Sequence, residues 1–334
     1  MTRWWPRTAA MGPAGRWGLI FLLLLGALSS MAPVLTTHSP ETQFDPASGR
    51  YLPPLSSRSA VQLSDGRWLL AQSVRPTSGG IELQRLGTTQ FVALPDLAVS
   101  DQKEIPQKLF FFLGTDKLGR DLWSRIVFGA RISLAIGVLA TAISLSLGIL
   151  IGALAALAGG WVDAILMRLV DALLMFPRLF LILTLAAFTG AQLWIVVLVL
   201  GLTGWMSVSR LVRAELLTLR EADFVLAARS IGQHPFRIFS RHMLPAALSP
   251  VLVDVSLRVG AVILIEAALS FLGLGVQPPT PSWGNIIADG MDALASAWWV
   301  TTFPGLALSA TVIAFNLVGD GMRDLLDPHK RTAP

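Results

Sequence analysis

The longest charge-free run of the chain, from Ile132 to Leu157, limits what it can fold into more than any other feature, because its 26 residues include no Asp, Glu, Lys or Arg. About 20 apolar residues in an α-helix are enough to cross the hydrocarbon core of a bilayer. The whole chain of 334 residues is 53% hydrophobic and only 14% charged, too apolar for a soluble domain of this size. We therefore expect an all-α polytopic protein embedded in a lipid bilayer.

Five further apolar stretches predict a total of six transmembrane helices. The stretch at 17–35 favours an uncleaved anchor, with a cleaved signal peptide as the alternative because its "ALSSMA" offers small residues near a cleavage position. The stretch at 179–188 is too short to cross, so its helix is expected to begin upstream and to be kinked at Pro177. The other three spans are expected at 193–208, 246–274 and 298–318.

Arginine is distributed unevenly between the short loops, which predicts the orientation. Six arginines lie between the fourth and fifth spans, and the leader and the tail are basic, whereas the short loops on the other side contain no Lys or Arg. The positive-inside rule then places both termini in the cytoplasm. The expected organisation is a cytoplasmic leader at 1–16, helix 1 at 17–35, an extracytoplasmic segment at 36–131, a core with helices 2–6 at 132–322 that includes a cytoplasmic loop at 213–245, and a cytoplasmic tail at 323–334.

Two smaller patterns predict local structure. The segments "RWLLAQSVR" and "GIELQRL", separated by a turn-prone "PTSGG", favour a small β-hairpin in the extracytoplasmic segment. Ser144, Gly148, Gly152, Ala156 and Gly160 recur every four residues and place a stripe of small side chains on one helical face, where another helix can approach closely.

Several classes of function lack their sequence signatures. The chain has no cysteine, its four histidines lack metal-ligand spacing, and no P-loop or hydrolase motif is present. A pI near 10.4 suits arginines on the cytoplasmic side of a membrane better than a nucleic-acid surface, since no basic groove interleaved with aromatic residues accompanies the charge. We therefore expect a non-catalytic chain that binds no cofactor, metal or nucleic acid.

The stretch "LAARSIGQHPFRIFSRHMLP", at 226–245, lies in the basic cytoplasmic loop. Its pattern predicts a helix over 225–231 that ends at Gly232 and a second short helix over 236–243. Two short helices with an apolar and a basic face could rest on anionic lipid or insert into a groove of a soluble partner. Physical chemistry alone leaves both alternatives open.

This stretch resembles the coupling-loop signature of ATP-binding-cassette importer permeases, which reads E-A-A, three residues, G, nine residues, I-x-L-P. Ala227-Ala228, Gly232 and Leu244-Pro245 match its spacing, whereas Leu226 stands at the glutamate and His242 at the isoleucine. Further segments between 113 and 328, among them "LGTDKLGRDLWSRIVFGARISL" and "EAALSFLGLGVQPPTPSWG", resemble the second permease subunit of the oligopeptide, dipeptide and nickel branch. The segment at 36–106 does not fit the short loop expected of that branch.

The resemblance implies a type I importer permease fold with six transmembrane helices in the bacterial inner membrane. It also implies three kinds of partner, namely a homologous permease subunit in a heterodimer, two ATPase subunits that use ATP, and an extracytoplasmic solute-binding protein. Peptides are the implied substrate, with nickel or another small solute as the alternative. An ATP-independent secondary transporter is the competing class, in which Glu266 would serve as a coupling carboxylate.

Three groups of residues are candidates for function. Contact with the ATPase is implied for Leu226, Ala227, Ala228, Arg229, Gly232, Arg237, His242, Leu244 and Pro245, although the arginines could equally be topology determinants. Intramembrane polar residues that could line the substrate path or stabilise the bundle are Arg178, Asp254, Arg258, Glu266, Asn316 and Asp320, and the four-residue spacing of Asp254 and Arg258 predicts an ion pair. An outer gate or docking loop, or a stiff connector, is indicated by Pro278, Pro279 and Trp283, with the tryptophan expected at the membrane interface.

Overall fold

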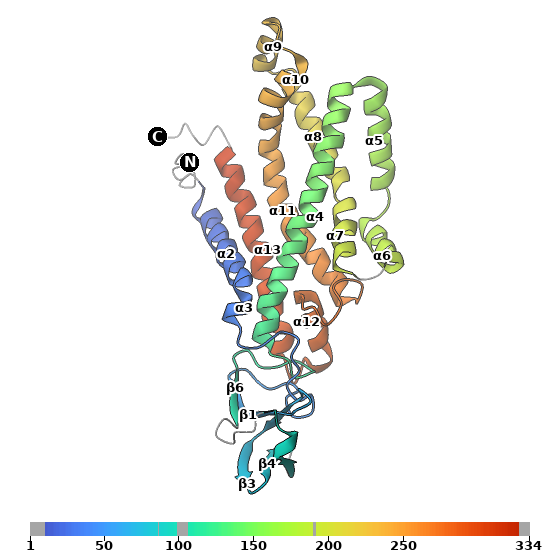
Figure 1. The fold of residues 1–334 in the computed structure, drawn as a ribbon. Coiled ribbons are helices and arrows are strands. Elements are labelled where there is room, and N and C mark those ends of the chain that lie inside the picture. Colours follow the sequence, from blue (N-terminus) through green and yellow to red (C-terminus); the bar gives the residue numbers. More distant parts are fainter. Residues whose placement is uncertain (1–10, 86, 99–105, 190–191, 327–334) are drawn as a thin grey trace. The chain divides into compact units, whose positions relative to one another are not determined.

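The computed structural model describes residues 11–85, 87–98, 106–189 and 192–326. The chain consists of two compact units, each defined by contacts among its own residues. Figure 1 shows the helices and strands of both units. Unit 1 comprises Met1–Leu25, Leu134–Leu269 and Ser309–Pro334, and unit 2 comprises Gly26–Ser133 and Ser270–Leu308. The first ten residues of the predicted leader and the last eight of the predicted tail lie outside the described residues.

Helices make up most of the described chain, which confirms the all-α polytopic class. They are α2 (Pro13–Ser30), α3 (Ala32–Leu35), α4 (Leu122–Ala158), α5 (Gly160–Leu174), α6 (Arg178–Thr189), α7 (Leu193–Leu202), α8 (Trp205–Arg220), α9 (Asp223–Ser230), α10 (Pro235–Ile238), α11 (Leu244–Phe271), α12 (Trp283–Gly290) and α13 (Trp299–Leu326). Among the described residues, five helical segments are long and apolar enough to cross a membrane: Pro13–Ser30, Leu122–Ala158, Leu193–Arg220, Pro235–Phe271 and Trp299–Leu325.

The third predicted crossing is broken rather than kinked, so the expectation of one continuous helix through Pro177 was wrong. Helix α5 ends at Leu174 and α6 begins at Arg178. Proline has no N–H to donate and disfavours the helical conformation of the residue before it, which explains a full interruption here. Helix α5 contacts α8, and α6 contacts α7, so two broken segments pack alongside each other in unit 1.

Within the predicted stripe of small residues, Gly148 and Gly152 of α4 contact α8 closely, as expected from the spacing, whereas Gly160 lies beyond the end of α4 and begins α5. A Cβ added at Gly148 would collide with the side chain of Val208. A Cβ added at Gly152 would lie 2.5 Å from the carbonyl oxygen of Ser209 and 2.9 Å from the Cβ of Val212. Real Cβ atoms do not approach this closely, so glycine lets the two backbones pack.

Unit 2 contains two antiparallel three-stranded sheets. One has the order β2–β1–β6, formed by Trp68–Ala71, Ser56–Gln62 and Gln107–Phe111, and the other has the order β3–β4–β5, formed by Ser73–Thr77, Gly80–Arg85 and Thr88–Ala93. The predicted hairpin is confirmed as β3–β4, in which Thr77 pairs with Gly80. The segment "RWLLAQSVR" is however divided between the two sheets, because β2 pairs with β1 instead.

Both faces of the β2–β1–β6 sheet contact apolar clusters, which explains why a short insertion can fold. Ala60 and Leu70 belong to one apolar cluster that also contains Phe44 and Phe111. The next residues along the same strands, Val61 and Ala71, belong to a second cluster with Ile81 and Leu83 of β4. Successive side chains of a strand point to opposite faces, so one strand serves two cores.

A buried ion cluster in unit 2 joins the start of α4 to α12. Asp116 pairs with Arg120, at 2.6 Å between Oδ2 and Nε, and with Arg125. Asp289 of α12 pairs with the same two arginines, at 2.9 Å from Arg120 and 3.1 Å from Arg125, and with Lys117 at 2.8 Å. The carboxylates compensate guanidinium groups that are almost completely inaccessible to water, which gives the segment "LGTDKLGRD" a structural role.

Replacing Asp116 by asparagine tests this role. Asp116→Asn leaves two buried arginines with one carboxylate between them, so we expect a loss of about 3–5 kcal/mol of stability, because breaking a buried ion pair strands a charge. The measurement is thermal unfolding of the purified full-length chain in detergent. The matched control is Asp65→Asn, at an exposed carboxyl whose pKa is held below its usual value by hydrogen bonds from the Arg67 backbone and side chain. Equal unfolding temperatures for the two variants would contradict the role.

Candidate functional site

Helices α9 and α10 are joined by a tight turn, and α9 agrees with the first of the two predicted short helices. Helix α9 ends at Ser230, and Gly232 follows its C-cap with a φ of +76°, which is accessible to glycine at little cost. The N–H of Gly232 donates to the carbonyl of Arg229, and that of Gln233 to the carbonyl of Ala228. His234 then caps α10, its ring nitrogen accepting from the N–H of Phe236 at 3.3 Å.

The second short helix is not separate, contrary to expectation. A π-helical turn at Phe239–Met243 follows α10 and leads directly into α11 at Leu244. Pro245 occupies the second position of α11 and has no N–H to donate to the π-helical turn before it. The turn between α9 and α10 is therefore joined to a transmembrane helix without an intervening loop.

One face of this segment is buried in unit 1. Val225 is fully buried, and Ala228, Ile238 and Met243 are at most 7% exposed. They share an apolar cluster with residues of three long helices, namely Ala153, Ala156, Val208, Val212, Leu216, Ala247 and Val251. The cluster fixes α9 and α10 to α4, α8 and α11, so a force on the short helices reaches the long ones.

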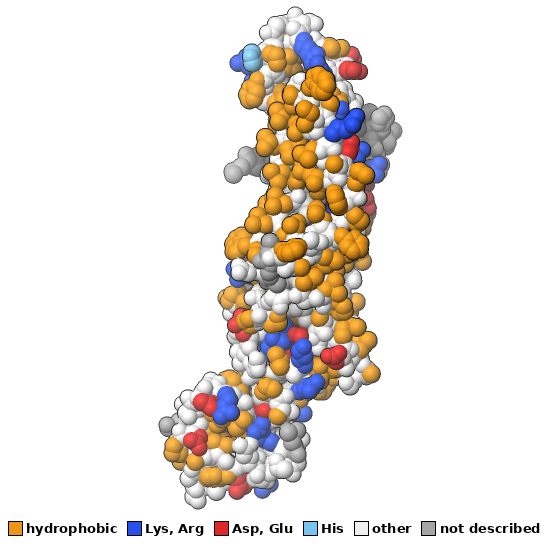
Figure 2. All heavy atoms as spheres, turned by 90° about the vertical axis from the view of Figure 1, so that its right-hand side faces the viewer, with side chains coloured by type: hydrophobic (Ala, Val, Ile, Leu, Met, Phe, Trp, Pro, Cys, Tyr) orange, Lys and Arg blue, Asp and Glu red, His pale blue; other side chains and the backbone are white. Residues whose placement is uncertain are grey.

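The opposite face is exposed and mixes apolar with basic side chains. Four large apolar residues are 45–74% exposed there: Phe224, Leu226, Ile231 and Phe236. Arg229, Arg237 and Arg241 are exposed beside them. Figure 2 shows apolar and basic side chains together at the end of unit 1 that α9 and α10 form. We call residues 224, 226, 227, 229, 231, 236, 237 and 241 the outer face.

The predicted contact residues divide between the two faces. Leu226, Ala227, Arg229, Gly232 and Arg237 are exposed, as is Pro245 at the start of α11. Ala228 is only 7% exposed and belongs to the buried cluster. His242 and Leu244 are half-buried. The two alanines of the signature therefore lie on different faces of α9. Ala227 is exposed, whereas Ala228 packs α9 against the long helices α4, α8 and α11.

The arginines of α8 have partners within the chain. Arg213 forms a two-bond ion pair with Asp163 of α5, at 2.5 Å for Nε and 2.6 Å for Nη2. Arg210 lies 3.4 Å from Asp171, with both side chains more than half exposed. These pairs attach α5 to α8, whereas in the described part of the chain neither Arg229 nor Arg237 belongs to an ion pair.

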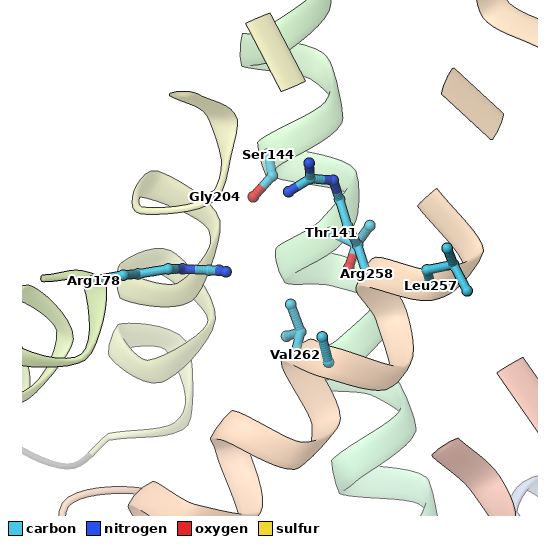
Figure 3. Close-up of a pocket in the computed structure, with 8 residues that line it drawn as sticks. Thr141, Ser144, Arg178, Gly204, Leu257, Arg258 and Val262 are labelled. Atoms are coloured by element: carbon cyan, nitrogen blue, oxygen red, sulfur yellow. The ribbon is translucent and has the colours of Figure 1, made fainter. Parts of the chain in front are cut away.

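A second group of predicted residues meets in a pocket of unit 1. The pocket has a volume of about 200 Å³ and is lined by Thr141, Ser144, Arg178, Gly204, Leu257, Arg258, Ala261 and Val262. The predicted pair of Asp254 and Arg258 is confirmed, and Nη1 of Arg258 also donates to the Ser207 hydroxyl at 3.0 Å. Figure 3 shows Arg178 reaching from α6 toward α4 and α11.

The remaining polar candidates do not line this pocket. Glu266 is completely buried in α11 and takes part in an interaction there. Asn316 and Asp320 are exposed and lie four residues apart on one face of α13. The structure therefore brings Arg178, Asp254 and Arg258 together and leaves the other three apart.

The proline-rich loop of unit 2 differs from the expectation at Trp283. Pro278 and Pro279 lie before α12, and Ser282 and Asn285 cap that helix reciprocally. Trp283 is fully buried, and its indole N–H donates to the carbonyl of Ile126 at 3.1 Å. The expected position at the membrane interface was wrong, because the side chain finds its hydrogen-bond acceptor inside the protein.

The sequence reasoning missed the residues that complete the pocket. Thr141 and Ser144 lie on α4, and Ser144 was interpreted only as part of a packing stripe. Gly204 lies between α7 and α8, and a Cβ there would collide with the Ser144 hydroxyl. The sequence feature that could have indicated the pocket is the pair of hydroxyl residues Thr141 and Ser144, which lie about one turn apart on an otherwise apolar helix.

Comparison with known proteins shows the family. A family model described as "Binding-protein-dependent transport system inner membrane component" matches residues 148–332, more than half of the chain. The chain belongs to this family. It is a multi-pass permease component of the inner membrane, as predicted.

Relatives of known name support the same assignment. The permease is 38% identical over 231 residues to the dipeptide transport system permease protein DppC of Bacillus subtilis, which covers 69% of this chain and 72% of that one. It is 42% identical over 217 residues to the glutathione transport system permease protein GsiD of Pectobacterium atrosepticum, which covers 65% and 72%. These matches confirm the resemblance to the peptide branch.

A solved structure supports the fold. A chain of the methionine ABC transporter MetNI, in an inward-facing conformation, superposes with a TM-score of 0.50 at 20% sequence identity. The superposition covers 61% of the permease and 97% of that chain. The expected importer permease fold is thereby confirmed, while the β-sheets of unit 2 are an insertion before its core.

The two faces of α9 predict opposite effects for adjacent substitutions. Ala228→Asp places a charge in the buried cluster without a partner, so we expect the purified permease to lose several kcal/mol of stability. Ala227→Asp adds the same charge at an exposed position and is expected to leave the unfolding temperature unchanged. Thermal unfolding in detergent measures both. A stable Ala228→Asp variant would show that the cluster does not hold α9.

Proposed function

We propose that this chain is a transmembrane subunit of an ATP-driven importer of peptides and that α9 and α10 couple it to an ATPase. Its family consists of components of binding-protein-dependent transport systems, and relatives that share more than a third of its aligned residues carry names for dipeptide and glutathione transport. The observation that carries the proposal is the outer face, which is exposed, apolar and basic, on a segment whose inner face is buried.

The outer face suits a protein groove better than a lipid surface. Its apolar residues lie on two helices that meet at a tight turn, so they form a compact knob rather than one long amphipathic stripe. A short helix inserted into a groove buries such residues and places arginines at the rim, where they pair with acidic side chains. Ala227 lets the helix approach closely.

Coupling follows from the continuity between α10 and α11. When ATP closes two ATPase subunits on each other, each moves the helix pair seated in its groove. The buried cluster passes this movement to α4, α8 and α11, which changes the side of the membrane to which the substrate path opens. The permease itself binds no ATP in this mechanism.

The proposed assembly contains this permease, a homologous permease as its heterodimer partner, two ATPase subunits and an extracytoplasmic solute-binding protein. Both termini and the outer face lie in the cytoplasm, which agrees with the arginine-rich loop. The family assignment favours this importer over an ATP-independent transporter, and the names of the relatives favour peptides over nickel.

Crosslinking from single cysteines tests the coupling contact, because the chain has no cysteine of its own. A cysteine at Ala227 is expected to crosslink to a cysteine introduced in the groove of a co-expressed ATPase subunit, with a yield that changes on ATP binding. A cysteine at Ala228 serves as the matched control, since its burial is expected to prevent the reaction.

Two results would contradict the proposal. One is an equal yield of crosslinks to the ATPase from cysteines at Ala227 and Ala228. The other is a cysteine at Ala227 that never captures an ATPase and reacts instead with a probe dissolved in the lipid phase, which would place α9 on the membrane surface.

A further inference from the structure

The pocket between α4, α6 and α11 collects positive charge within the apolar helices of unit 1. Arg178 is the first residue of α6, and its side chain lines the pocket together with that of Arg258 from α11 (Figure 3). Asp254 neutralises Arg258 through its ion pair. Within the described part of the chain Arg178 belongs to no ion pair, so the pocket retains one positive charge without a counter-charge.

Two polar atoms of the pocket residues lack hydrogen-bond partners. The Nε of Arg178 and the hydroxyl of Thr141 are both buried, and within the described residues neither has a hydrogen-bond partner. A buried guanidinium donor without an acceptor costs free energy, and an uncompensated charge costs more. An anion that accepts from both groups would remove these costs, so the pocket is complementary to an anion.

The shape of the pocket favours a carboxylate attached to a small apolar group. A guanidinium offers parallel N–H donors that match the two oxygens of a carboxylate. Leu257, Ala261 and Val262 supply an apolar wall beside the charged end. Gly204 keeps the opposite wall open, since a Cβ there would lie 3.4 Å from Nη2 of Arg178.

We propose that this pocket binds the C-terminal carboxylate of a peptide during transport, with Arg178 as the main ligand and Thr141 as a second donor. The proposal rests on the proposed function, because a peptide importer passes molecules that carry one free carboxylate at their end. Arg258 is held by Asp254 and Ser207, so it shapes the pocket and keeps its potential positive.

Direct binding to the full-length chain in phosphatidylcholine nanodiscs tests the site without an ATPase. The probes are the dipeptide Ala-Ala and its C-terminal amide, which differ only at the carboxylate, and binding is measured by calorimetry. We expect the free acid to bind at least tenfold more tightly than the amide, as for loss of a charge-assisted hydrogen bond. Equal binding of acid and amide would overturn the proposal.

Variants assign the effect to the pocket. Arg178→Gln is expected to weaken binding of Ala-Ala at least tenfold, and Arg178→Lys less, since lysine keeps the charge but not the paired donors. Thr141→Val removes one hydroxyl at similar volume and is expected to weaken binding several-fold. Arg75→Gln, at an exposed arginine of β3, is the matched control and is expected to bind as the unmodified chain does. Unchanged binding by both Arg178 variants would overturn the assignment.

Two further probes distinguish other anions. Inorganic phosphate that competes with Ala-Ala at equal concentration would show a general anion site and overturn the peptide assignment. Loss of dipeptide binding when phosphatidylglycerol is added to the nanodiscs would show that a lipid headgroup occupies the pocket. A failure of dipeptide binding together with ATP-sensitive crosslinks at Ala227 would overturn this site and leave the importer function intact.

Discussion

The buried attachment of α9 to the long helices is the contact on which the rest of the proposed mechanism depends. A short helix of eight residues is marginal by itself, so its geometry comes from Val225 and Ala228 in the shared cluster. Without that cluster, a partner that binds the outer face would pull out a flexible loop and the bundle would not respond. With the cluster in place, a partner that binds Phe224 or Ile231 also displaces α8 and α11, because α9 is packed against them.

Close packing of α4 against α8 extends this attachment toward the middle of unit 1. Gly148 and Gly152 bring the two backbones together, and Ala153 and Ala156 then enter the cluster that holds α9. Packed helices move as rigid bodies because their interiors have little free volume. The ion pairs of Arg213 and Arg210 add α5 to the same body. Movement at the outer face thus reaches the elements that position the pocket.

The sequence predicted those features that depend on local pattern. The spans other than the third, the glycine turn at 232, the Asp254–Arg258 pair and the close approach of Gly148 and Gly152 all follow from helical spacing and residue type. Other features depend on which segments meet. The burial of Trp283 requires the carbonyl of Ile126, and the different faces of Ala227 and Ala228 require α8 beneath them. The sequences of β1, β5 and β6 do not alternate regularly between polar and apolar residues, so the pattern typical of a strand is absent.

The break at Pro177 shows why the pocket could not be predicted and why it is informative. A continuous kinked helix would have carried Arg178 in its middle, where the residue could turn toward a neighbouring helix. The interruption places Arg178 at the start of α6, where free N–H groups add positive potential instead of a counter-charge. Such an arrangement is unfavourable for stability alone, since among the described residues Asp254 pairs with Arg258 and no carboxylate forms an ion pair with Arg178. A negatively charged ligand supplies that compensation only while it is bound, so the site can bind its substrate and still release it.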